Sequence, residues 1–249
     1  MEDIFTYYRV RLEFITKLCA SVPADPNLIA KWLESRQPRV KPPGGRSIDE
    51  INEEVLASLP EEEEPVQGLI FQRDNSNGAN LVLRTATFRA HIKDCAEIIS
   101  SFYIGRIQGE RSFAVKVKHC VYHDEKCYWT PILRPDGSKL IEADGKLERP
   151  VHSFVKGRPV NSLKMFEFVE SAVAEFTLKI LGDIVKEKDL ETLFLYGGTH
   201  GYGGERSNGE GRYTFSIQQI NKAEEVKEHG REKAGRHPAA NDKRSEQRS

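Results

Sequence analysis

The feature that most constrains the fold of this 249-residue chain is a glycine-rich segment near its C-terminal end. The segment runs from Gly197 to Tyr213 (GGTHGYGGERSNGEGRY) and holds seven of the chain's 19 glycines. Glycine backbone can adopt positive φ and approach a ligand closely, and consecutive free amides in such a loop form an anion-binding concavity. Donors suited to phosphate lie among the glycines: His200, Arg206, Ser207 and Arg212.

The surroundings of this segment exclude two familiar phosphate-binding loops. No Lys-Ser or Lys-Thr pair follows the glycines, as a Walker loop requires. A dinucleotide-binding loop follows a strand and opens a helix, whereas this segment follows a predicted helix (186–195) and opens a predicted strand (212–220). The alternative reading is a flexible glycine loop that binds no ligand.

Apolar periodicity predicts the remaining elements. Alternation predicts strands at 7–14, 69–72, 113–122 and 128–133, and one long strand or a bent strand pair at 166–181. Helical spacing and capping residues predict helices near 27–33, 47–59 and 87–101. We expect 113–122 to pair with 128–133, so that residues 106–160 form extended hairpins. This order predicts an α+β fold in which helices cover one face of an antiparallel sheet that contains both 7–14 and 213–217.

Charge is balanced over the whole chain but unevenly distributed along it. The 37 Lys plus Arg and 38 Asp plus Glu give a formal net charge of -1, which excludes a globally basic nucleic-acid binder. Acidic residues concentrate in 47–64 and basic residues between 84 and 164, so a local basic face could meet a polyanion; an ordinary solvated surface explains the pattern equally well. The charged tail, 221–249, is expected to be disordered, which leaves residues 1–220 as one domain.

The cysteine content and the hydropathy of the chain indicate the cellular compartment of the protein. The four cysteines include no CxxC pair, which argues against a disulfide scaffold and suits a reducing environment. The first residues lack the pattern of a signal peptide, and no apolar run approaches the roughly 20 residues of a membrane helix. We therefore expect a cytoplasmic protein that does not enter a membrane.

Three segments, in order along the chain, carry a resemblance to a known family. They are LRTATFRAHIKDCAEII (83–99), FEFVESAVAEFTLKIL (166–181) and GGERSNGEGRY within the glycine-rich segment. Together they resemble the RAMP superfamily, the RNA-binding subunits of CRISPR effector complexes with a C-terminal glycine-rich loop, and most closely its backbone-type subunits. Two features depart from the family pattern: Glu210 stands where an aromatic residue is usual, and the acidic insertion at 47–65 is not part of it.

The resemblance implies a modified ferredoxin-like (RRM-like) core with a projecting hairpin insertion, which maps to 106–160. It also implies RNA-backbone contacts from the turn around Thr85, Thr87 and Arg89 and from the glycine loop at Gly203, Gly204, Arg206, Ser207 and Gly209. Lys116 and Lys118, on one face of the predicted strand 113–122, complete the predicted RNA-binding set. Arg89 and Arg206 are expected to lie on the same face and to bind phosphates.

The function implied is that of a non-catalytic subunit that binds single-stranded guide RNA within a larger ribonucleoprotein assembly, beside other subunits or further copies of itself. Two alternatives stay open. One is a RAMP-type endoribonuclease that processes CRISPR transcripts, with His119, His123 or His200 as the acid or base. The other is a phage or plasmid interaction protein of similar shape that binds or mimics such a complex, which the acidic block would favour.

Metal binding and other catalytic arrangements have weaker support. His119, Cys120, His123 and Cys127 include the ligand types that zinc uses, but their spacing is not that of a standard knuckle. Asp25 lies in a helix-start motif, and His91 lies on the apolar face of a predicted helix, so both are interpreted as structural. No Ser-His-Asp or paired-carboxylate arrangement follows from the spacing, and we expect no cofactor or metal.

Overall fold

A computed structural model describes residues 4–24, 68–74, 79–102, 112–124, 127–155, 158–182 and 184–220. Four sequence predictions lie wholly or partly outside these residues: the helix near 27–33, the acidic insertion at 47–65, the tail at 221–249 and part of the segment 106–160. The assignment of residues 1–220 to one domain stays a prediction.

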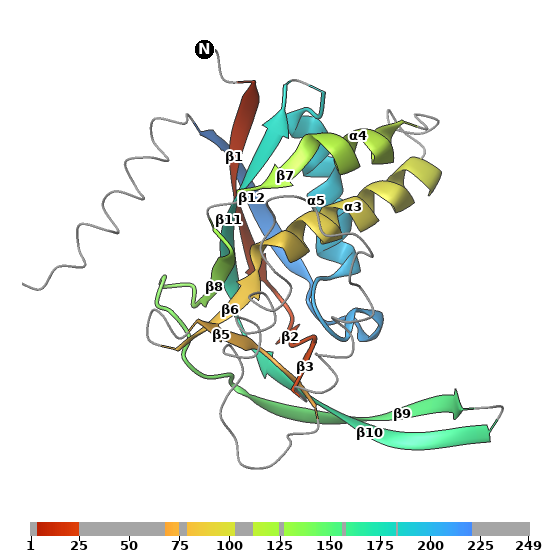
Figure 1. The fold of residues 1–249 in the computed structure, drawn as a ribbon. Helices are drawn as coiled ribbons and strands as arrows, with labels where there is room; N and C mark the ends of the chain where they lie inside the picture. Colours follow the sequence, from red (N-terminus) through yellow and green to blue (C-terminus); the bar gives the residue numbers. More distant parts are fainter. Residues whose placement is uncertain are drawn as a thin grey trace, which may run out of the picture.

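The strand nearest the N-terminus, β1 (Phe5–Phe14), is the second strand from one edge of the main sheet. It pairs antiparallel with β12 (Tyr213–Ile220) on one side and with β11 (Val173–Leu181) on the other. In this register Val10 lies opposite Ile217 on β12 and Phe176 on β11. The prediction that the first and last strands share one antiparallel sheet is confirmed (Figure 1).

The sheet continues beyond β11 through shorter strands. The strand β7 (Val121–His123) pairs with the end of β11 that carries Leu178, and β8 (Trp129–Leu133) pairs with its beginning at Val173. From β8 the sheet runs to β6 (Asn80–Arg84) and then to β5 (Gln72–Asp74). All of these pairings are antiparallel.

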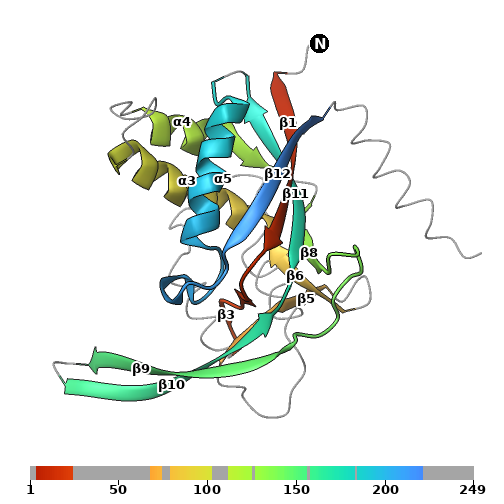
Figure 2. The same cartoon turned by 180° about the vertical axis from the view of Figure 1, so that it is seen from behind.

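Three α-helices of the described residues lie on one side of this sheet: α3 (Thr85–Phe102), α4 (Phe113–Cys120) and α5 (Glu187–His200). Figures 1 and 2 show all three on the same side of β1, β11 and β12. Every second residue of β1 from Tyr8 to Phe14 is buried in the core beneath them, together with Phe88 of α3 and Leu193 of α5. The α+β class with antiparallel pairing is therefore confirmed. No helix within the described ranges is both long and apolar enough to span a membrane.

A second sheet carries the projecting hairpin. Its central strand, β10 (Arg158–Val169), pairs antiparallel with β9 (Gly145–Val155) over its whole length. The base of β10 also pairs with β2 (Leu18–Cys19) and, in parallel, with β4 (Leu69–Ile70), which itself pairs with β3 (Val22–Pro23). Figures 1 and 2 show the outer part of β9 and β10 extending away from the rest of the chain. The hairpin therefore comprises 145–169, and the predicted bounds of 106–160 were wrong.

The predicted strand at 113–122 is also wrong. Residues Phe113–Cys120 form the helix α4, and only Val121–His123 form a strand, so Lys116 and Lys118 lie on a helix. The buried residues Phe113, Val117 and Cys120 follow helical spacing, and α4 packs against α3. The strand β8 consequently pairs with β6 and β11 instead of with 113–122.

Two element boundaries matter for the glycine-rich segment. Of the two forms predicted for 166–181, the bent strand pair is confirmed: it divides at 170–172, and its first part belongs to the hairpin. The predicted helix at 186–195 extends to His200 as α5, so Gly197 and Gly198 are helical. The glycine loop proper is therefore 201–212.

Candidate functional site

The glycine loop (201–212) is held against the chain that follows β1. The amide of Gly204 donates to the Cys19 carbonyl at 2.9 Å, and the amide of Gly211 donates to the Lys17 carbonyl at 2.8 Å. Loop amides that donate to carbonyls of the protein belong to Gly201, Tyr202, Gly204, Asn208, Gly209, Glu210 and Gly211. These amides cannot form the anion-binding concavity that the sequence suggested, so the cation and hydroxyl side chains become the main candidate contacts for an anion.

Two glycines are required for close backbone approach. Gly211 has φ of 72°, and a Cβ built on it would lie 1.9 Å from the carbonyl oxygen of Tyr202. Gly197, inside α5, faces the side chains of His91 and Tyr213, where a Cβ would lie 2.7 Å from His91 Nε2 and 2.3 Å from the Tyr213 hydroxyl oxygen. Any side chain at either position would displace neighbouring atoms.

The side chain of Tyr202 joins the glycine loop to the start of α3. Its ring stacks on Phe88, with centroids 4.7 Å apart and planes 8° apart, and Phe88 in turn stacks on Phe176 at 4.1 Å. The hydroxyl of Thr87 donates to the carbonyl of Arg84, which leaves it to accept a hydrogen bond from the Tyr202 hydroxyl. Burial raises the pKa of Tyr202, so this hydroxyl stays neutral.

His91 is buried on the inward face of α3, as predicted, and shares a 2.9 Å hydrogen bond with the hydroxyl of Tyr213. Burial lowers the pKa of His91 to about 3, and the charges of Arg206 and His200 act in the same direction. The imidazole is therefore neutral at pH 7.

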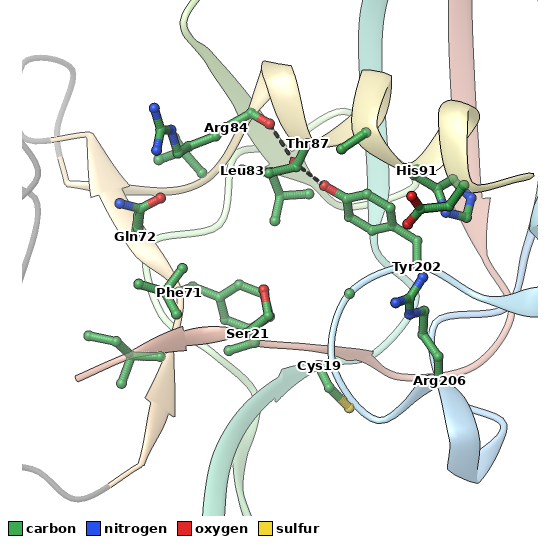
Figure 3. A pocket seen from close by; sticks show the side chains of 17 residues that line it. Cys19, Ser21, Phe71, Gln72, Leu83, Arg84, Thr87, His91, Tyr202 and Arg206 are labelled. Atoms are coloured by element: carbon green, nitrogen blue, oxygen red, sulfur yellow. Dashed lines mark hydrogen bonds between the residues drawn. The ribbon is translucent and has the colours of Figure 1, made fainter. Parts of the chain in front are cut away.

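A cavity of about 280 Å³ opens between the glycine loop, α3, and the ends of β3, β5 and β6 (Figure 3). Aliphatic, aromatic and polar side chains line it, and they include Phe71, Gln72, Arg84, Thr87, Tyr202 and Arg206. Of the ten predicted RNA-contacting residues, Thr87, Gly203 and Arg206 line this cavity. The segment Thr85–Arg89, predicted as a turn, is the first part of α3, and the structure brings it and the glycine loop to a single opening.

Arg84 and Arg206 supply positive charge to this cavity from two different elements. Arg84 is the last residue of β6, and Arg206 lies in the exposed 3₁₀ turn Arg206–Asn208 of the glycine loop. Asp94 is the acidic residue among the described lining residues. Sequence reasoning missed Arg84, although its position directly before the predicted Thr85–Arg89 turn was a usable signal.

The remaining predicted contacts lie elsewhere. Thr85 is buried and hydrogen-bonds the hydroxyl of Thr130 at 2.9 Å. Arg89 does not line the cavity: its guanidinium donates to the carbonyls of Val121 at 2.7 Å and Lys118 at 2.9 Å, at the C-terminal end of α4. Lys116 and Lys118 lie on α4 itself. Gly204 forms a bridge with Cys19, and Ser207 and Gly209 are exposed at the loop tip. Their RNA contacts stay predictions.

Two glutamates of the glycine loop are bound by cations of the hairpin, a feature that sequence reasoning missed. Lys164 Nζ on β10 lies 2.7 Å from Glu205 Oε1, and Arg149 Nη2 on β9 lies 3.2 Å from Glu210 Oε1. Arg149 Nη1 also lies 3.6 Å from Glu205 Oε2. Burial acts to raise the pKa of Glu205, but hydrogen bonds from Lys164 and Asn208 outweigh it and lower that pKa. Glu205 and Glu210 thus join the glycine loop to the hairpin.

The candidate catalytic histidines and metal ligands are dispersed. His119 is exposed near the end of α4, and His123 lies in β7. His200 ends α5, with its Nε2 3.4 Å from Arg206 Nη1, and burial together with the Arg206 charge lowers its pKa. Within the described part of the chain, no three His, Cys, Asp or Glu side chains come together as metal ligands would.

The comparison with solved structures gives remote likenesses, one of which is described here. No protein-family model and no curated protein matches the chain. Its structure is similar to a chain in the cryo-EM structure of the Type III-B Cmr-beta bound to cognate target RNA, with a TM-score of 0.39 and 9% sequence identity. The match covers 87% of this chain and 61% of that chain. A likeness at this level assigns neither family nor function.

Proposed function

We propose that this protein binds single-stranded RNA at the opening between the glycine loop and α3. The observation that carries the proposal is the shared cavity lined by Thr87 of α3 and by Gly203 and Arg206 of the loop. Two segments that the sequence singled out for the same ligand lie more than 100 residues apart, and the fold brings them to one place. That convergence is expected of a binding site.

The charges at this opening suit a phosphodiester backbone. The guanidinium groups of Arg84 and Arg206 come from opposite sides of the cavity, and planar guanidinium groups bind phosphate oxygens in pairs (Figure 3). Figure 3 shows Arg84 and Gln72 on one side and Arg206 beside Tyr202 on the other. An RNA strand that crosses the opening would pass both cations. Each phosphate contact would displace counterions condensed on the RNA.

We further propose that the main sheet is a modified ferredoxin-like core. The order β12–β1–β11–β7, antiparallel throughout, with α3 between β1 and β7 and with α5 between β11 and β12, supports this assignment. Together with the sequence resemblance, it leads us to propose a RAMP-type, non-catalytic subunit of a CRISPR-like ribonucleoprotein assembly in the cytoplasm. Its partners would be guide RNA, other subunits or further copies of this chain.

The test is RNA binding by the full chain at several salt concentrations, measured by fluorescence anisotropy with a labelled unstructured RNA. Arg84→Ala and Arg206→Ala should each weaken binding and lower the slope of log affinity against log salt by roughly 0.7. Lys188→Ala is the matched control, because Lys188 is exposed at the first turn of α5, the end away from the loop. Equal affinities for the wild type and the folded Arg84→Ala/Arg206→Ala double variant would exclude this site.

A cleavage assay accompanies the binding assay. Without added metal, the RNA should stay intact over the time of the measurement. Cleavage that disappears in His119→Ala, His123→Ala or His200→Ala would instead establish the endoribonuclease alternative.

A further inference from the structure

We propose that the cavity between the glycine loop and α3 receives one unstacked base of the bound RNA, and that this base is selected by its hydrogen-bonding edge. The inference rests on the proposed RNA binding and extends it from backbone contact to base recognition. Contacts to the RNA backbone alone give the same affinity for every RNA sequence, whereas a base held in a cavity makes the affinity depend on the sequence.

The size and walls of the cavity fit one planar ring system. Its volume of about 280 Å³ lies just below the roughly 300–1,000 Å³ that small-molecule pockets occupy. Leu83 and Phe71 lie on facing sides of it, and Tyr202 bounds it on a third (Figure 3). Apolar and aromatic walls around a small volume favour a flat ring over a flexible polar ligand.

The aromatic wall is the end of a stack. Phe176, Phe88 and Tyr202 stack in that order, with successive centroids 4.1 Å and 4.7 Å apart. Tyr202 is the member of this stack that lines the cavity, while Phe88 and Phe176 lie behind it in the core. A base that enters therefore meets the terminal ring of a rigid aromatic column, the kind of contact that single-strand binders use to hold unstacked bases.

Polar groups of the cavity can read the edge of that base. Gln72 is buried, and Figure 3 shows its side-chain amide at the side of the cavity opposite Tyr202. An amide side chain presents a donor and an acceptor together, and can therefore distinguish base edges that differ in their donor and acceptor pattern. Ser21 adds a hydroxyl at the exposed side. Arg84 and Arg206 remain available for the phosphates on either side of the inserted base.

The experiment compares two tryptophan variants of helix α3. Ala90 and Ala86 are both exposed alanines of this helix, but Ala90 lines the cavity and Ala86 does not. Ala90→Trp places a ring at the cavity mouth without disturbing the core, and Ala86→Trp is the matched control. Binding of the full chain to labelled 12-nucleotide poly(A), poly(C) and poly(U) is measured by anisotropy, with circular dichroism to check the folding of each variant.

We expect the wild type to prefer one of the three RNAs. Ala90→Trp should weaken binding of that RNA roughly tenfold, the effect of losing one stacked base, and bring the three affinities together. Ala86→Trp should bind each of the three RNAs with the affinity of the wild type. Gln72→Leu should reduce the preference by weakening binding to the favoured RNA while leaving the other two nearly unchanged.

The outcomes separate this inference from the proposed function. Failure of the wild type to bind any of the three RNAs would overturn both. Binding of all three with equal affinity, unchanged in Ala90→Trp, would overturn base recognition and leave RNA binding in place. Equal weakening of all three RNAs by Ala90→Trp would also overturn base selection, because it would show that the cavity mouth meets only the backbone.

Discussion

His91 Nε2 lies 2.9 Å from the hydroxyl oxygen of Tyr213, which joins a buried residue of α3 to the first residue of β12. The bond is possible because position 197 of α5, which packs against this pair, is glycine. Three elements that surround the glycine loop therefore meet at this one contact. The geometry of the candidate site depends on a neutral, buried imidazole.

This contact predicts a pH dependence of stability. Burial lowers the pKa of His91 to about 3, below its ordinary value of 6.5, so between these values the unfolded chain binds a proton that the folded chain does not. The free energy of unfolding should therefore be highest above pH 6.5 and fall, by up to about 1.4 kcal/mol per pH unit, as the pH drops toward 3. Urea unfolding at several pH values should show this slope in the wild type and a shallower one in His91→Gln. Equal slopes in the wild type and in His91→Gln would contradict the assignment of His91 as a buried, neutral imidazole.

Glycine substitutions in the loop should differ according to the space around each position. Gly209 and Gly211 both have positive φ, but a Cβ at 209 has no heavy atom within 4 Å, whereas one at 211 would lie 1.9 Å from the Tyr202 carbonyl oxygen. Gly209→Ala should cost about 1–2 kcal/mol, the penalty of left-handed backbone alone. Gly211→Ala adds overpacking and should cost about 2–5 kcal/mol.

Chemical denaturation measures both losses, and Gly209→Ala serves as the control for Gly211→Ala. A smaller loss in Gly211→Ala than in Gly209→Ala would show that the loop does not have this backbone path.

Elements with one unambiguous pattern were predicted from the sequence. The alternation in β1 matches the buried residues from Tyr8 to Phe14, and the inward face of α3 contains Phe88, His91, Ile92 and Cys95, as their helical spacing indicated. The segment FAVKVKHC was ambiguous, because its valines favour a strand while Phe113, Val117 and Cys120 fit a helix. Packing against α3 decides between them, and no local pattern reports that packing.

The hairpin was placed wrongly because prolines interrupt its sequence pattern. Pro150 and Pro159 lie within β9 and β10, and prolines inside a strand-like run normally argue against a strand. Contacts between distant segments were equally inaccessible: Arg149 and Glu210 are 61 residues apart. The glycine-loop amides, too, were predicted to be free, in part because the segment 15–20, whose carbonyls accept two of them, lies far away in the sequence.

Substitution of Arg89 distinguishes a structural role from RNA contact. Its guanidinium donates to the carbonyls of Lys118 and Val121 and lies over the Tyr122 ring, 4.9 Å from its centroid. Arg89→Ala should lower the free energy of unfolding by about 1–3 kcal/mol, since charge-assisted hydrogen bonds to the end of α4 are lost. The free energy of unfolding of Arg89→Lys should lie between those of the wild type and Arg89→Ala. The opposite result, unchanged stability with a lower salt slope of RNA binding, would support the phosphate contact predicted from the sequence.

The ion pair between Lys164 and Glu205 should contribute to stability because one partner is almost fully buried. The Glu205 side chain is only 6% exposed, and its backbone adopts left-handed φ of 59°. Lys164→Met removes the cation at 2.7 Å and leaves the carboxylate with Asn208 and the more distant Arg149. We expect a loss of about 1–3 kcal/mol in the free energy of unfolding, because a buried charge that loses its partner retains its desolvation cost.

A second substitution shows whether that loss comes from the unpaired charge. Glu205→Gln in the Lys164→Met background removes the charge while keeping the hydrogen bond that Asn208 can make, so the double variant should recover most of the lost stability. Hydrogen exchange at the Gly204 amide, which donates to Cys19, reports loop opening directly and should accelerate in Lys164→Met but much less in the double variant. If Glu205→Gln changes the free energy of unfolding equally in the wild type and in Lys164→Met, the pair does not interact, and the hairpin does not stabilise the glycine loop through Glu205.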